Sequence, residues 1–199
     1  MASRLAPAPG DARRTLLDAS LALLAEQGLE GFSMREVARR AGLSHQAPYH
    51  HFPDREAILA AIVAEGFQSL RDASLAALEG RTDPRARFTA IGRAYVTFAL
   101  SHPAHFKLMF RSELVREDRH DEAKACAQGA FDVLVQIAGE VADATGYDAR
   151  DLAVLAWSLV HGLATLSLEG KLDKATGSDQ EREAATARAL SFFEALLRK

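Results

Sequence analysis

The segment "GLSHQAPYHHFPDRE" (residues 42–56) concentrates side chains that can bind a metal or form hydrogen bonds. These side chains are His45, Gln46, Tyr49, His50 and His51. Imidazole is a common metal ligand, so a metal centre is the first chemistry to consider. However, His45 and His50 are five residues apart, about 140° around a helix, and His50 and His51 are adjacent and diverge. We therefore expect neither a metal nor another cofactor at this segment.

A second histidine motif leaves an enzymatic alternative open. His120-Asp121 is the dipeptide at the centre of helical His-Asp metal-dependent phosphohydrolases. Further ligands could come from His102 or His105 and from Asp143 or Asp151. The flanking sequence "EDRHDEAK" is strongly charged, which is typical of a solvated helix start and gives a metal no apolar surroundings. We expect the chain not to be an enzyme, with the phosphohydrolase as the alternative.

The elements that must position these residues are helices. The chain has 199 residues, of which 48% are hydrophobic and 26% charged, as is usual for a globular protein. Apolar residues recur at spacings of three and four rather than two, which predicts an all-α fold. We expect a disordered arm over residues 1–10, a helix-turn-helix domain over residues 11–55 and a helical bundle for ligand binding and dimerisation over residues 56–199. Asp11 is expected to cap the first helix, which ends near Gly28.

Later helices are expected to start after Asp54, Asp83 and Asp148, and the capping box "SDQE" (178–181), with Ser178 as its cap, is expected to open the last helix.

The next two predicted helices are short and joined by a tight turn. In "SMRE" (33–36), Ser33 is a helix cap and Glu36 is placed to reach back to it, as in a capping box. Gly42 suits the left-handed position after that helix, and Ser44 can cap a third helix ending near residue 52. Two such helices form a helix-turn-helix, which presents its second helix to the major groove of DNA.

The two faces of the predicted helix 44–52 differ in chemistry. Residues four apart share a face, so Ala47 with His51 and Pro48 with Phe52 can face inward. The outward face carries only hydrogen-bonding side chains: Ser44, His45, Gln46, Tyr49 and His50. Such a face suits base edges and phosphates. Residues 33–55 carry four arginines against Glu36 and Asp54, so the local charge is modestly basic, 4 − 2 = +2. If His45 and His50 touch phosphate, DNA affinity should rise below the reference histidine value of about 6.5.

The stretch "FSMREVARRAGLSHQAPYHHFPDREAIL" (32–59) resembles the helix-turn-helix of TetR-type bacterial transcriptional regulators. The matching elements are a Ser-capped helix, Ala-Gly-Leu-Ser, Tyr-x-x-Phe and a basic residue, Arg55, where lysine is commoner. The resemblance implies an all-helical homodimer with a small-molecule pocket in its C-terminal region. It also implies phosphate contacts from Ser33, Tyr49 and Arg55. The expected DNA-binding set is Ser33, Ser44, His45, Gln46, Pro48, Tyr49, His50 and Arg55.

Two C-terminal segments resemble a TetR subgroup named for its Trp-His-Gly motif: "WSLVHG" (157–162) and "HPAHFKLMF" (102–110). Two readings stay open for Trp157 and His161, which share a helical face: they order core packing, or they line a pocket. In the second reading the pocket binds a small apolar inducer. Its expected lining is Phe88, Tyr95, Phe106, Met109, Phe110, Trp157 and His161.

The predicted helices 148–170 and 179–198 are too apolar for packing within one chain to cover both faces. In the resembled family these positions form the dimer interface. The expected interface residues are Leu159, Leu166, Leu190, Phe193 and Leu197. A homodimer with two recognition helices would bind a pseudo-palindromic operator on double-stranded DNA, and we expect a ligand-responsive repressor. A helical dimeric scaffold without DNA binding is a further alternative.

The sequence also bears on location. The first ten residues lack the apolar stretch of a signal peptide. Residues 152–168 are nearly long enough to cross a membrane, but they include Ser158, His161 and Ser167, which favours a buried core helix. We therefore expect a cytoplasmic protein without membrane contact.

Overall fold

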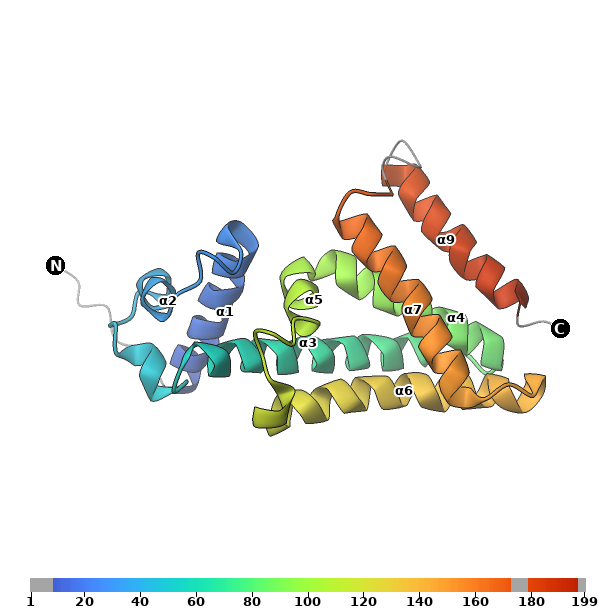
Figure 1. Cartoon of the computed structure of the whole chain (residues 1–199), viewed down its shortest axis with the longest axis horizontal. Coiled ribbons are helices and arrows are strands. Elements are labelled where there is room, and N and C mark those ends of the chain that lie inside the picture. Colours follow the sequence, from blue (N-terminus) through green and yellow to red (C-terminus); the bar gives the residue numbers. More distant parts are fainter. Residues whose placement is uncertain (1–8, 173–178, 197–199) are drawn as a thin grey trace. The chain divides into compact units, whose positions relative to one another are not determined.

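The computed structural model describes residues 9–172 and 179–196, and the described part is helical with no strand (Figure 1). This confirms the predicted all-α fold. In chain order the elements are α1 (Pro9–Gln27), α2 (Met34–Ala41), the 3-10 helix η1 (Ala47–His50), α3 (Arg55–Leu78), α4 (Pro84–Ser101), α5 (Pro103–Met109), the 3-10 helix η2 (Glu117–Arg119), α6 (Asp121–Thr145), α7 (Ala149–Leu168) and α9 (Asp179–Leu196).

The contacts divide the chain into two compact units. The first comprises the described residues up to Gly66 together with Ala104–Lys124. The second comprises Phe67–Pro103 and the described residues from Ala125 onward. This division differs from a boundary between residues 55 and 56, because α3 runs without interruption from one unit into the other and the segment after α4 returns to the first unit.

In the first unit, α2 packs against α1 and η1 packs against α2. Apolar side chains of these elements, of the beginning of α3 and of α5 are buried. The most deeply buried are Leu16, Leu23, Val37, Ala38, Ile58, Leu59, Ile62 and Val63. Helix α1 begins at Pro9, so the expectation that Asp11 caps it is wrong. Residues 1–8 of the expected arm lie outside the described residues.

The start and end of α2 follow the predicted signals in all but one respect. The Ser33 hydroxyl accepts a hydrogen bond from the Glu36 backbone N–H at 3.2 Å, and Gly42 is left-handed with φ 68°. The backbone N–H of Leu43 donates to the Ala38 carbonyl, which closes the turn after the helix. The Glu36 carboxylate does not complete the capping box, because it accepts instead from Arg39 and Arg40.

Asp-based caps set the starts of three later helices. Asp54 accepts from the Ala57 N–H at the start of α3, Asp83 accepts from Ala86 before α4, and Asp148 accepts from Arg150 and Asp151 at the start of α7. Each bond satisfies a backbone donor that the helix leaves unpaired. These three caps were predicted from the sequence. The predicted cap at Ser178 lies outside the described residues.

The core of the second unit lies between α4, α6 and α7, with Leu78 at the end of α3 packed against it. Helix α4 contributes Phe88 and Ile91. Helices α6 and α7 contribute Val133, Ile137, Ala138, Val141, Ala142, Leu152, Ala153 and Ala156. Helix α4 also packs along α7 and α9 (Figure 1).

Helix α7 is half buried rather than fully buried. Leu152, Ala156, Val160 and Ala164 face the core, whereas Leu155 on the opposite side is 56% exposed. Among the described helices, α7 alone has the length and apolar composition that a membrane crossing would need. These are weak grounds for a span, because core helices meet the same criteria.

Candidate nucleic-acid interface

The segment between α2 and α3 forms a helical turn, but it is tighter than predicted. Residues 47–50 form a 3-10 helix, not the expected α-helix over 44–52. The Ser44 carbonyl accepts from the Ala47 N–H at 3.0 Å, and Gln46 accepts from Tyr49 at 3.1 Å. An α-helix would instead bond the Ser44 carbonyl to the N–H of residue 48. Pro48 has no N–H, which favours the shorter i to i+3 bond.

Despite the tighter winding, burial sorts this segment as the residue spacing predicted. Phe52 is buried, and Ala47 and His51 are half-buried. The exposed residues are Ser44, His45, Gln46, Tyr49 and His50. The Tyr49 side chain is 52% exposed, which is a high value for so large a ring. The exposed face therefore offers hydroxyl, amide and imidazole groups and no aliphatic side chain.

Pro48 leaves the set of candidate DNA contacts. Its side chain is among the most deeply buried in the chain, with less than 2% of its surface accessible. Phe52, one turn later, is also buried, and the Arg13 guanidinium lies 5.3 Å from the centre of its ring. Pro48 and Phe52 therefore anchor the segment to the first unit, and they leave its polar face outward.

Two further candidates lie on either side of this segment. Ser33 is exposed at the N-terminus of α2, where the helix dipole favours an anion. Arg55 is exposed at the start of α3, but its guanidinium donates to the Leu29 carbonyl at 2.9 Å and lies 5.6 Å from the Phe32 ring. Arg55 is thus partly occupied in holding the loop before α2, and only its remaining donors can reach a phosphate.

Ion pairs occupy two of the arginines that made the local sequence basic. Arg39 binds Glu36, and Arg40 binds both Glu36 and Glu26. Hydrogen bonds from Arg39 and then Arg40 lower the pKa of Glu36 to about 2, so it stays ionised. Arg35 is exposed on the first turn of α2, and no acidic side chain of the described residues pairs with it. Arg35 is therefore a further candidate for a phosphate contact that was not predicted; its place two residues after the cap was the available signal.

No metal site takes shape around the remaining histidines. His120 Nε2 lies 3.3 Å from Glu56 Oε1, and His105 Nε2 lies 3.6 Å from Glu65 Oε1. Across the described parts of the chain, no group of three His, Cys, Asp or Glu side chains is arranged to hold a metal ion. The geometry therefore offers no observation in favour of the His120-Asp121 phosphohydrolase.

The residues expected to line a ligand pocket are divided between the units. Phe106 and Met109 are buried in the first unit, where Phe106 makes an edge contact with Phe110 at 5.3 Å. Phe88 belongs to the apolar core of the second unit. The other three, Tyr95, Trp157 and His161, form a hydrogen-bonded group within the second unit.

That group joins α4 to α7. The Trp157 indole N–H donates to the Tyr95 hydroxyl oxygen at 3.3 Å, and the Tyr95 hydroxyl lies 2.8 Å from His161 Nδ1. Burial lowers the pKa of His161, so a neutral ring can accept the Tyr95 proton at Nδ1. Burial also raises the pKa of Tyr95, which keeps its hydroxyl protonated. These contacts support the packing interpretation of Trp157 and His161.

The expected dimer-interface residues also differ in surroundings. Leu166 is exposed and Leu159 is half-buried on α7. Leu190 is buried within the second unit, near Gly92 of α4, so we remove it from the interface set. The Phe193 side chain and Leu197 lie outside the described residues. Leu155 was not among the expected residues, although Leu155, Leu159, Gly162 and Leu166 follow helical spacing on one face.

Comparison with known families gives matches over both parts of the chain. A family model described as "Bacterial regulatory proteins, tetR family" matches residues 16–62, which include the helix-turn-helix. A second model, described as "Tetracyclin repressor-like, C-terminal domain", matches residues 88–193. The second match alone covers more than half of the chain.

Similar regulators are known from several bacteria. The chain is 36% identical to the HTH-type transcriptional regulator BetI of Rhizobium meliloti over 81 residues, which cover 41% of this chain and 40% of that protein. It is 28% identical to the HTH-type transcriptional activator FasR of Mycolicibacterium smegmatis, over 66% of this chain and 63% of that protein. Both matches span less than two thirds of the relative. A third match, to the HTH-type transcriptional regulator BetI of Cronobacter sakazakii, has 28% identity and covers 90% of this chain and 86% of that protein.

Solved structures extend the likeness to nearly the full chain. A protein of unknown function from Rhodococcus sp. RHA1 is 33% identical with a TM-score of 0.73, over 96% of this chain and 98% of that one. A regulatory protein in the tetR family from Rhodococcus RHA1 shares the fold, with 20% identity and a TM-score of 0.73 over 94% and 96%. Together with the matches to both family models, this shows that the chain belongs to the TetR family of bacterial regulatory proteins, which are not enzymes.

Proposed function

We propose that this protein is a DNA-binding regulator of transcription that acts in the cytoplasm. It reads double-stranded DNA through residues 44–50, with Ser33, Arg35 and Arg55 placed to contact phosphates. The observation that carries the proposal is the division of the helix-turn-helix segment into two faces. Pro48 and Phe52 are buried as anchors, and Ser44, His45, Gln46, Tyr49 and His50 are exposed with hydrogen-bonding groups only.

A selection of DNA from a random pool tests this proposal directly. The full chain is immobilised at low salt, bound sequences are amplified over several rounds, and the products are sequenced. We expect enrichment of a sequence with two-fold symmetry, because two copies of the helix-turn-helix would contact two half-sites. Recovery of unenriched sequence would refute DNA reading and favour the helical scaffold as the alternative.

Substitutions within the interface separate base contacts from phosphate contacts. Gln46→Ala should relax preference at particular base pairs, because an amide can make paired hydrogen bonds to one base. Tyr49→Ala and Arg35→Ala should weaken binding to all sequences if they contact phosphate, and Arg35→Ala, which removes a positive charge, should also reduce the salt dependence of binding. Tyr147→Ala, an exposed tyrosine of the second unit, is the matched control and should bind as the wild type does. Equal effects of Gln46→Ala and Arg35→Ala on all sequences would contradict the division of roles.

We further propose that the protein works as a homodimer joined through α7. Leu155, Leu159 and Leu166 form an apolar stripe on its outer face, and apart from the adjacent part of α7 itself, nothing in the described chain lies within 4 Å of a Cβ built at Gly162 between them. A small residue in such a stripe allows a second helix to approach closely. Leu155→Glu should therefore shift the mass measured by light scattering from dimer to monomer. A monomeric wild type would overturn this part.

The proposed mode of regulation is repression by occupying the operator, relieved when a ligand binds the second unit. The ligand would act by binding the DNA-competent and DNA-incompetent states with different affinity. The similar protein from Mycolicibacterium smegmatis is named an activator, so the sign of regulation needs its own test. We expect a reporter gene placed behind the selected operator to fall in expression when the protein is produced. A rise in expression would replace repression with activation and leave DNA binding intact.

A further inference from the structure

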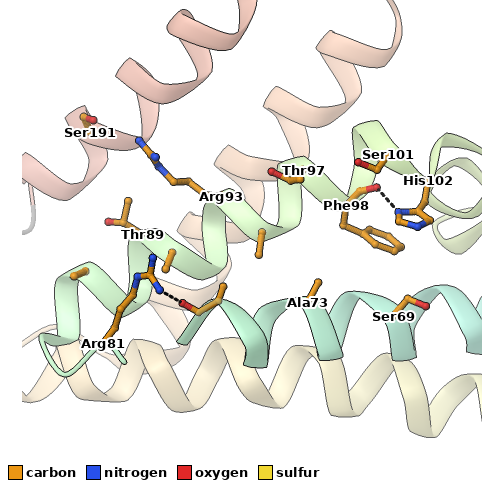
Figure 2. A pocket seen from close by; sticks show the side chains of 14 residues that line it. Ser69, Ala73, Arg81, Thr89, Arg93, Thr97, Phe98, Ser101, His102 and Ser191 are labelled. Carbon is orange, nitrogen blue, oxygen red and sulfur yellow. Dashed lines mark hydrogen bonds between the residues drawn. The ribbon is translucent and has the colours of Figure 1, made fainter. Parts of the chain in front are cut away.

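The second unit contains an open cavity that the expected pocket residues do not line (Figure 2). Its volume is about 630 Å³, comparable to sites for small organic ligands. Side chains from α3, α4 and α9 surround it, together with residues that follow α3 and α4. The described lining consists of Ser69, Ala73, Ala77, Arg81, Ala86, Thr89, Ala90, Arg93, Ala94, Thr97, Phe98, Ser101, His102 and Ser191.

The two long walls of this cavity differ in chemistry. At about 100° per residue, Thr89 and Arg93 lie on one edge of the α4 stripe, and Ala94 and Phe98 lie on the other. Figure 2 shows Arg93 extending from α4 toward Ser191 of α9, and the α3 residues Ser69 and Ala73 on the other side of α4. One wall therefore carries the Arg93 guanidinium and hydroxyl groups, and the other combines alanine side chains and the Phe98 ring with the polar side chains of Ser69, Ser101 and His102.

The charge of the lining is one-sided. It includes Arg81 and Arg93 but no Asp or Glu among the described residues. Arg81 is partly used by the end of α3, because it donates to the carbonyls of Ala77 and Glu79. Arg93 is exposed, and the described chain supplies it with no acidic partner. This contrasts with Arg87, six residues earlier on α4, which the Glu140 carboxylate holds at 2.8 Å. Among the described side chains, Arg93 is therefore the lining cation without an acidic partner or a backbone carbonyl to hold it.

We propose that this cavity binds a small molecule with a carboxylate or phosphate group attached to an unbranched apolar body. Arg93 binds the anionic group, with the hydroxyls of Thr89 and Ser191 beside it. The apolar body lies against Ala73, Ala90, Ala94 and Phe98. The lining of α4 from Ala86 to Ser101 extends for about 22 Å, which suits an elongated ligand. The regulatory meaning of this binding rests on the proposed function, because only a DNA-binding regulator would convert occupancy into a signal.

Calorimetric titration of the full chain with three probes tests the proposal without DNA. Decanoate and decyl phosphate carry the two anionic groups, and decanol has the same chain without a charge. We expect one or both anions to bind at least tenfold more tightly than decanol, and the tighter of the two identifies the head group. Equal binding of all three probes, or binding of none, would overturn the proposal.

Variants at the two walls check the assigned contacts. Arg93→Ala should weaken the tighter anion by about ten- to hundredfold, as expected for loss of a charged hydrogen bond, whereas Arg93→Lys should retain part of the affinity. Arg71→Ala, an exposed arginine of α3 outside the described lining, is the matched control and should bind as the wild type does. Unchanged anion binding in Arg93→Ala would refute the assignment of Arg93.

The apolar wall is tested by Ala73→Phe, which fills the cavity. It should abolish binding of both anions and leave the far-ultraviolet circular dichroism and the oligomeric state unchanged. A change of oligomeric state would show that this face contacts a second protomer and would overturn the proposal. Because these titrations contain no DNA, their outcome is separate from that of the DNA selection: either proposal can fail while the other stands.

Discussion

Tyr95 is the centre of the polar group that joins α4 to α7, and Tyr95→Phe removes its hydroxyl without changing the shape of the ring. Two hydrogen bonds are lost. The bond to His161 Nδ1 is short, at 2.8 Å, and leaves a half-buried acceptor without its donor. The bond from Trp157 is longer, at 3.3 Å, and Trp157 is 37% exposed, so water can replace it. We therefore expect the first bond to dominate, with a total loss of about 1–2 kcal/mol in the free energy of unfolding.

Urea denaturation followed by tryptophan fluorescence measures this loss, because Trp157 is the only tryptophan in the chain. Protein concentration is held constant, since dimerisation would contribute to the apparent stability. Tyr147→Phe is the control, because Tyr147 is 58% exposed and its hydroxyl is solvated. The emission maximum of folded Tyr95→Phe should also change, since the indole loses its partner. If Tyr95→Phe matched Tyr147→Phe in both stability and emission, the group would contribute nothing to the packing of α4 against α7.

Two further predictions concern pH and backbone conformation. Burial lowers the pKa of His161, so the unfolded chain binds a proton at this imidazole more readily than the folded chain does. The neutral His161 therefore contributes its full stability above about pH 6.5, and this stability is lost as the pH falls toward the folded pKa. His161→Gln should reduce the pH dependence of the melting temperature. Gly42→Ala should destabilise the protein by about 1 kcal/mol, because the backbone of Gly42 is left-handed with φ 68°. Gly139→Ala, within α6 and with open space at Cβ, should stabilise the protein by about 0.5–1 kcal/mol. If both substitutions changed the free energy of unfolding in the same direction, the conformational argument would be contradicted.

Local signals in the sequence were sufficient for most helix starts and for the sorting of the helix-turn-helix faces. Asp54, Asp83 and Asp148 cap helices because a side-chain oxygen needs only a backbone N–H two or three residues ahead. Such a contact depends on a few neighbouring residues, so it can be read without the rest of the fold. The same holds for Gly42, whose left-handed conformation follows from the turn it occupies.

Features that depend on distant residues were predicted less well. Glu36 was expected to complete a capping box, but its carboxylate binds Arg39 and Arg40 instead, and Arg40 also pairs with Glu26 of α1. The cavity combines residues of α3, α4 and α9, and its alanines carry no individual signal. The position of Leu190 on an apolar helix does not indicate which partner covers it, and Leu190 is buried because α9 packs against α4. Periodicity shows which side of a helix is apolar, but not whether its own chain or a second one covers that side.

The burial of Pro48 has a consequence for the thermodynamics of DNA binding. A proline ring fixes φ near −65° in every state of the chain, so this part of the segment has fewer conformations to lose than another residue would give it. The buried ring also ties the short turn to the first unit before any DNA is present. Much of the backbone ordering entropy is then lost during folding rather than during association. What the complex must still order are the exposed side chains around Tyr49, so a larger share of each hydrogen bond they make should appear as affinity.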